Sequence, residues 1–84
     1  MMKIVLRKQP QKYLASVDAN MRKKLNLALD GLREMQGDIV RLSGKKNLYR
    51  LKIEHYRVIF AYEGGEIIIV ETIESRTNIK YRRY

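Results

Sequence analysis

Three basic side chains, Arg50, Lys52 and Arg57, lie close together in the segment LYRLKIEHYRVIF, residues 48–60. This segment has the pattern of two short strands joined by a tight turn, and a hairpin of that kind would hold the three cations near one another. A fold needs the apolar positions of the hairpin but gains nothing from concentrated positive charge. The cluster therefore predicts an anionic partner, most simply a phosphate backbone.

The charge of the whole chain agrees with an anionic partner. The 84 residues include 18 Lys and Arg but only nine Asp and Glu, and the net charge of +9 favours nucleic acid or an acidic protein over a neutral small molecule. Residues 41–57 have six bases and one acid, Glu54, and residues 76–83 have four bases and no acid. Residues 61–75, between them, have four glutamates and no base. If both basic blocks face the same cleft, they form one electropositive site.

Composition also limits the class of protein. A chain of this length predicts one small domain, residues 1–84, with a modest core. The absence of cysteine excludes disulfides and thiolate metal sites. The glutamates of residues 61–75 are scattered by alternation and turn positions, and the one histidine, His55, stands beside a turn, so we expect no metal and no cofactor. Since no apolar run is long enough for a signal peptide or a membrane span, we expect a cytoplasmic protein.

The first half of the chain predicts a strand and two helices. Residues 2–7 are apolar and β-branched enough for a short strand. Pro10 suits the first turn of a helix that would run to about Val17. Asp18 is the expected N-cap of a second helix, and Gly37 stands where a C-cap glycine would, so we expect the helix to end just before it. The apolar positions of this helix repeat at three and four residues: Met21, Leu25, Ala28, Leu29, Leu32 and Met35.

After the helices the period changes to two. Residues 49–54 alternate between apolar and polar side chains, as in a half-buried strand with a basic polar face. Residues 56–62 predict a second strand, and the turn EGGE at 63–66 leads to the continuous apolar run 67–70. Such a run is expected for a central strand that is covered on both faces. The basic segment 73–84 is expected to leave the sheet and lie across its open side or edge.

The expected order is therefore β-α-α-β-β-β, with a possible further short strand at residues 38–42. Two N-terminal helices would pack on one face of a small, largely antiparallel sheet, in an α+β sandwich. The other face of the sheet would be free for a ligand.

The order of these motifs resembles the RelE/ParE toxin superfamily of bacterial toxin–antitoxin systems. The resemblance covers essentially the whole chain: the helix pair, the block GDIVRLSGKKNLYRLKIEHYRVIFAYEGGEIIIVETI and a terminal arginine segment that begins ESR. Its most specific part is the succession L-Y-R-L-K-I, Y-R-V-I-F, a glycine turn, the isoleucine strand and an arginine just after it. The resemblance implies a RelE-like, microbial ribonuclease-type fold.

The resemblance also implies an activity and two partners. Members similar to RelE are ribosome-dependent endoribonucleases that cut mRNA in the decoding site, beside the 16S rRNA, and a cognate antitoxin silences them by wrapping the toxin. By position in the motifs, the catalytic residues would be Arg50, Lys52, Arg57, Arg76 and Tyr81. Contacts to the RNA backbone would come from Lys45, Lys46, Arg82 and Arg83.

Two departures from the family pattern lie near the C-terminus. Tyr84 is a second choice for the family's C-terminal tyrosine, because the spacing after the arginine varies. The Gly-His or Gly-Lys that usually precedes the arginine is replaced by Glu74 and Ser75, so a histidine that some members have there is absent.

These residue types suit RNA cleavage without a metal. The 2′-OH must lose its proton, the phosphorane must be neutralised and the departing 5′ oxygen must be reprotonated. The guanidinium groups of Arg50 and Arg57 match phosphate oxygens in a bidentate way. Arg76 would support the leaving oxygen electrostatically, because arginine rarely gives up its proton. Lys52 or Tyr81 could take the 2′ proton, and the sequence does not decide between them; the tyrosine could instead stack on a base.

Two other functions stay open. A ParE-like toxin would inhibit DNA gyrase by binding it, although such relatives commonly lack the combined basic set on the hairpin and after the last strand. An inactive relative would serve mainly to bind its antitoxin. Under either toxin hypothesis, the partner would be an antitoxin with an acidic, partly disordered segment that covers the open sheet face or the helix pair.

Overall fold

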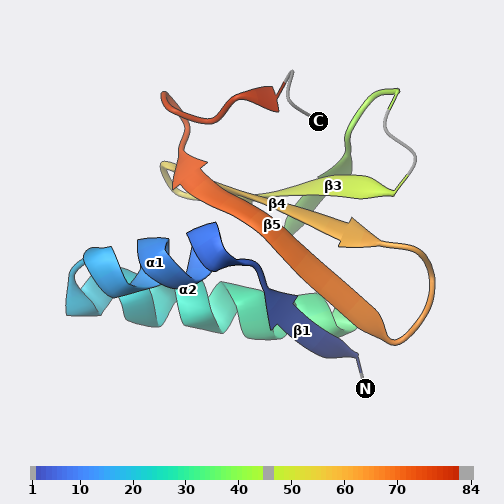
Figure 1. Cartoon of the computed structure of the whole chain (residues 1–84), viewed down its shortest axis with the longest axis horizontal. Coiled ribbons are helices and arrows are strands. Elements are labelled where there is room, and N and C mark those ends of the chain that lie inside the picture. The colour runs from blue at the N-terminus through green and yellow to red at the C-terminus, as the bar shows by residue number, and fades with distance from the viewer. Residues whose placement is uncertain (1, 45–46, 82–84) are drawn as a thin grey trace.

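The computed structural model describes residues 2–44 and 47–81, and these form two helices on one side of a five-stranded sheet (Figure 1). The strands are β1 (Lys3–Leu6), β2 (Asp38–Arg41), β3 (Leu48–Ile53), β4 (Tyr56–Tyr62) and β5 (Ile67–Ser75). The helices are α1 (Lys8–Ser16) and α2 (Ala19–Gly31), followed by a short 3-10 helix, η1 (Leu32–Glu34). The predicted α+β class is confirmed.

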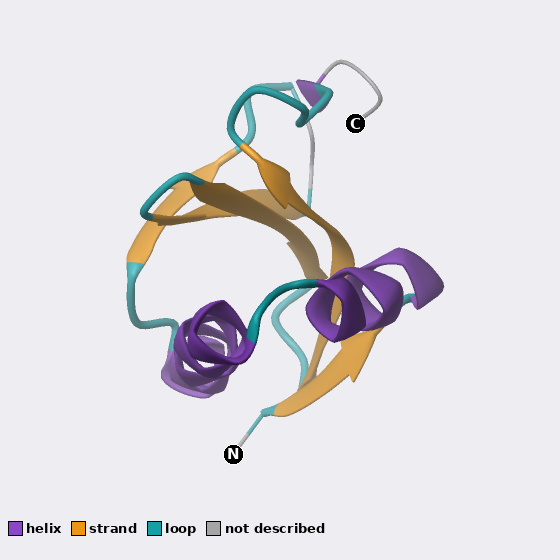
Figure 2. Ribbon diagram, turned by 90° about the vertical axis from the view of Figure 1, so that its left-hand side faces the viewer, coloured by secondary structure: helices purple, strands orange, loops and turns teal. Residues whose placement is uncertain are grey.

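The sheet has the order β1-β5-β4-β3-β2. Neighbouring strands are antiparallel except for β1 and β5, which are parallel with Lys3 opposite Ile67. The possible further strand is confirmed as β2, which pairs with β3 at one edge. Figure 2 shows the sheet curving over the two helices, with the C-terminal segment on its other side.

The core lies between the helices and the inner face of this sheet. Alternate residues of the strands point toward the helices and are buried, among them Leu51, Phe60 and Val70. The apolar positions of α2 cover them, and its buried members include Leu29. Full burial of one such side chain stabilises a protein by about 1.5–3 kcal/mol. The ring of Phe60 also stacks on that of Tyr49, with centroids 5.4 Å apart.

The strand β5 differs from the prediction in two ways. Ile68 is fully buried but Ile67 is 51% exposed, so the apolar run is covered on one face only, because both helices lie on that face. The strand also includes three residues of the segment that was expected to leave the sheet. Ile73 is a core residue paired with Val58, and this burial keeps the chain in the sheet as far as Ser75.

The helix α2 ends earlier than predicted. It stops at Gly31 and passes into η1, after which Met35 has a left-handed φ of 52°. The amides of Met35 and the next residue donate to the carbonyls of Leu32 and Gly31, both at 2.9 Å, which is the Schellman pattern of helix termination. Gly37 is therefore not the cap. Its φ is 124°, and a Cβ there would lie 2.6 Å from Leu51 Cδ1, so the glycine permits the close approach at the start of β2.

Polar side chains at the helix ends complete the backbone bonding. Asp18 caps α2 as predicted, because its Oδ1 accepts the Met21 amide at 2.9 Å. Arg22 donates to three carbonyls at the C-terminal end of α1, at 2.7–3.3 Å. Gln9 bonds to both the amide and the carbonyl of Ile73, at 2.9 and 2.8 Å, and so continues the pairing of β5 beyond β1. Neither of these helices is long and apolar enough to cross a membrane, and no other helix among the described residues is.

Candidate functional site

The β3–β4 hairpin positions the predicted basic cluster. Lys52 on β3 and Arg57 on β4 are directly opposite each other. Arg50 lies two residues before Lys52 and therefore on the same face. The neighbouring Leu51 and Val58 are buried in the core, so the three cations belong to the face of the sheet away from the helices.

Arg76 follows β5 directly and lies beside the turn of the same hairpin. Its backbone amide donates to the carbonyl of His55 at 2.6 Å. Two residues earlier, Glu74 is directly opposite Arg57 on β4. The backbones of the two basic blocks, residues 41–57 and 76–83, are thus hydrogen-bonded to each other at one end of the sheet, through His55 and Arg76.

The turn orients the guanidinium of Arg57. Its Nη1 donates to the carbonyls of Glu54 and Tyr56, both at 3.0 Å. A guanidinium has five N–H donors. The three on Nε and Nη2 have no hydrogen-bond partner within residues 2–44 and 47–81. This is the edge of the fork that can bind two oxygens of one phosphate.

Arg50 has a different environment from the exposed Lys52. Its side chain is 23% exposed, and Nη2 lies 3.4 Å from Asp38 Oδ1. Its Nε is buried without a hydrogen-bond partner among the described residues. Asp38 was not predicted as part of the site. The sequence indicated only a possible strand at residues 38–42, and in the structure this strand places Asp38 opposite Lys52. This carboxylate balances part of the charge of Arg50.

The other predicted site residues are not connected to this cluster by a described contact. Tyr81 is 37% exposed and lines a hollow of about 300 Å³ formed by residues 77–81. Its predicted catalytic role stays a prediction. Five further residues lie outside the described part of the chain: Lys45, Lys46, Arg82, Arg83 and Tyr84.

Glu54, the one acid of the first basic block, makes a contact that the sequence did not indicate. Its Oε2 lies 3.2 Å from Nζ of Lys24 on α2, and the two side chains are 49% and 55% exposed. The φ of Glu54 is 52°, and this left-handed conformation costs a residue other than glycine about 1–2 kcal/mol. An ion pair this exposed contributes only about 0–1 kcal/mol. The pair therefore does not fully offset the backbone strain.

Tyr13 of α1 packs against the same end of the sheet. Its ring lies 6.2 Å from that of Tyr56, edge to face. Burial raises the pKa of Tyr13 above 10.0, and the nearby Glu74 carboxylate and Tyr56 raise it further. The phenol of Tyr13 therefore stays protonated at neutral pH and is not suited to accept a proton.

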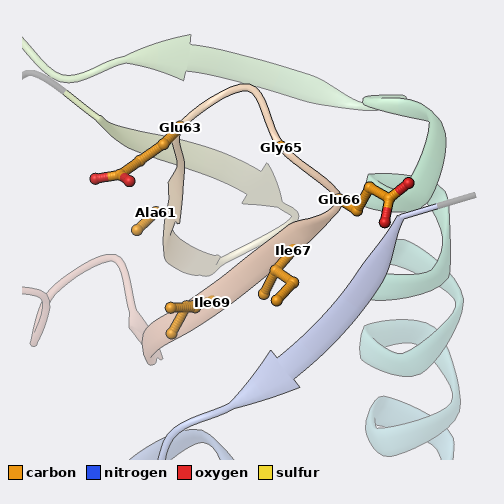
Figure 3. A pocket seen from close by; sticks show the side chains of 6 residues that line it. All are labelled: Ala61, Glu63, Gly65, Glu66, Ile67 and Ile69. Carbon is orange, nitrogen blue, oxygen red and sulfur yellow. The ribbon is translucent and has the colours of Figure 1, made fainter.

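The far half of the same sheet face is apolar and acidic. A shallow hollow of about 380 Å³ is lined there by Ala61, Glu63, Gly65, Glu66, Ile67 and Ile69. Figure 3 shows the three apolar side chains on one side of the sheet and the two glutamates at opposite ends of the hollow. The residues that line this hollow include two carboxylates and no cation, so this half of the face repels phosphate.

Comparison with known proteins shows what the chain is similar to. No protein-family model matches the chain. A chain of the crystallised RelB–RelE antitoxin–toxin complex from Methanococcus jannaschii has the same fold, with a TM-score of 0.70 and 23% identity over 87% of this chain and 91% of that one. Toxin RelE3 of Methanocaldococcus jannaschii is 26% identical over 86 residues, which covers 95% of this chain and 98% of the toxin. The chain is thus similar in sequence to a RelE toxin and has a RelE-like fold.

The RelE-like fold extends to a bacterial toxin. The isolated RelE toxin of E. coli has a TM-score of 0.74 and 15% identity to this chain, over 89% of this chain and 84% of that one. The resemblance that the motifs indicated is thereby confirmed.

Proposed function

We propose that this RelE-like chain is the toxin of a toxin–antitoxin system and that it cleaves mRNA on the ribosome without a metal. The main support is the arrangement at the β3–β4 turn. Lys52 and Arg57 are cross-strand partners there, and the Arg76 amide is bonded to the turn. The N–H groups on Nε and Nη2 of Arg57 suit a phosphate that carries extra negative charge in the transition state.

In this proposal the 2′-OH attacks the adjacent phosphate, and each cation has a separate task. Arg57 stabilises the phosphorane and Arg50 supports it from the neighbouring strand position. Arg76 stabilises the departing 5′ oxygen. The unprotonated form of Lys52 or Tyr81 takes the 2′ proton, and the departing 5′ oxygen takes a proton from water. The upstream product ends in a 2′,3′-cyclic phosphate and the downstream product begins with a 5′-OH.

The substrate and its setting complete the proposal. The mRNA is bound on the ribosome, in the cytoplasm, where Lys45, Lys46, Arg82 and Arg83 contact RNA backbone, including that of the 16S rRNA. Single-stranded mRNA exposes its phosphates to such a cluster, and the net charge of +9 favours the encounter.

The proposal is tested by inducing the chain in cells and mapping the 5′ ends of transcripts. We expect new ends inside translated reading frames, all with a 5′-OH that a polynucleotide kinase can phosphorylate. These ends should disappear in the Arg76→Ala variant. Ends with a 5′-phosphate would contradict attack by the 2′-OH. Intact transcripts together with trapped gyrase–DNA complexes would instead establish the ParE-like function.

We also propose an antitoxin with an acidic segment as the protein partner. The support is the charge of this chain and its likeness to a chain of a crystallised antitoxin–toxin complex. We expect the product of the adjacent gene to copurify with the chain, in a complex that weakens as salt concentration rises. Expression without toxicity and without such a complex would contradict both the partner and the toxin function.

A further inference from the structure

The β3–β4 turn joins three segments that are far apart in the sequence. Lys24 of α2 pairs with the Glu54 carboxylate at 3.2 Å. Arg57 of β4 donates to the Glu54 carbonyl at 3.0 Å. Arg76, after β5, donates its amide to the carbonyl of His55 at 2.6 Å. The position of this turn therefore sets the guanidinium of Arg57 and the backbone of Arg76, two arginines that the proposed reaction uses.

Glu54 is an unusual residue for this turn. Two-residue hairpin loops favour glycine or asparagine where φ is positive, and Glu54 has a φ of 52°. Its exposed ion pair with Lys24 does not offset the strain of that conformation, as described above. Stability alone thus gives no reason for a glutamate here. What the side chain does supply is an ion pair that links the turn to α2.

We propose that Glu54, held by Lys24, is a positioning residue for Arg57 and Arg76. The ion pair favours one position of the turn. In that position the carbonyls of Glu54 and Tyr56 hold Nη1 of Arg57, so that Nε and Nη2 face the phosphate. The carbonyl of His55, in the same turn, holds the Arg76 amide and so places the start of the segment after β5. This inference rests on the proposed nuclease function.

The test uses the full chain with one of four substitutions. Glu54→Gly removes the carboxylate and relieves the positive φ, whereas Lys24→Met removes only the ammonium. Lys24→Arg keeps the ion pair. Arg33→Met is the matched control, because it removes a cation and an exposed ion pair with Asp30, at 3.6 Å, away from the turn.

We expect Glu54→Gly and Lys24→Met to lower kcat for mRNA cleavage on ribosomes by up to about fivefold with little change in KM, because that is the largest shift in the position of the turn that loss of so exposed an ion pair can cause. The melting temperature of Glu54→Gly should stay equal to that of the wild type or rise. Lys24→Arg and Arg33→Met should keep the wild-type rate. A merely structural role predicts instead that activity follows stability in all four variants.

Hydrogen exchange of the Arg76 amide provides a second readout that needs no activity. We expect faster exchange in Glu54→Gly and Lys24→Met than in the wild type and in Arg33→Met. If the wild-type chain does not cleave RNA, the nuclease proposal fails, and the exchange rates still decide whether Glu54 positions the turn. Unchanged Arg76 protection with unchanged kcat in both variants would overturn the inference.

Discussion

Arg57→Ala is expected to lower kcat for mRNA cleavage on ribosomes by about 10²- to 10³-fold, the usual loss when one preorganised donor to a transition-state oxyanion is removed. The guanidinium is held by the turn carbonyls, and its other N–H groups are directed at the phosphorane in the proposed reaction. The measurement is single-turnover cleavage of a defined mRNA in programmed ribosomes. The free energy of unfolding should fall far less than in a core variant, because Arg57 is outside the buried core and loses only its two hydrogen bonds to the turn.

Two variants serve as controls for Arg57→Ala. Arg57→Lys keeps the charge but loses the bidentate fork, so its rate should lie between those of the wild type and the alanine variant. Arg33→Ala removes an exposed cation of η1 and should leave the rate unchanged. A wild-type rate for Arg57→Ala would remove Arg57 from the mechanism.

Phe60→Ala is expected to lower the free energy of unfolding by about 3–5 kcal/mol, the usual cost of emptying a buried aromatic site. Phe60 is fully buried on β4 and stacks on Tyr49. Because small domains are stable by only about 5–15 kcal/mol, the variant should melt far below the wild type. Urea unfolding followed by circular dichroism gives the difference.

The control for Phe60→Ala is Ile67→Ala. Ile67 is 51% exposed on the adjacent strand, so its truncation should cost much less, on the order of 0.5 kcal/mol. Equal losses in the two variants would show that the inner face of the sheet is not the principal core.

The elements that the sequence predicted well are those with a local cause. The apolar repeat of α2 and the alternation of β3 arise because one face of each element is buried, and Asp18 caps the next helix through its own neighbours. The end of α2 was predicted wrongly. The helical segment formed by α2 and η1 ends at Met35, which has a positive φ, and nothing in the local sequence indicates that a methionine would adopt this conformation. Gly37 resembled a C-cap glycine, but it is a glycine because of its close approach to Leu51.

Contacts between distant segments could not be predicted from the sequence. The parallel pairing of β1 with β5 joins the two ends of the chain, and no periodicity indicates it. In the site, Lys52 and Arg57 were predictable neighbours because a tight hairpin connects them. The ion pair of Lys24 with Glu54 depends on how α2 lies against the sheet. The charge pattern of the sequence does not indicate which lysine of the helix would lie beside Glu54.

The most direct test of the central claim is a structure of the chain on a ribosome with an mRNA whose scissile nucleotide has a 2′-O-methyl group, which blocks the attack. The proposed mechanism predicts that the oxygens of one phosphate lie about 3 Å from Nε and Nη2 of Arg57, with Lys52 and the Arg76 guanidinium on the same phosphate. A scissile phosphate elsewhere on the chain, or Arg57 and Arg76 directed to opposite sides of the sheet, would contradict it.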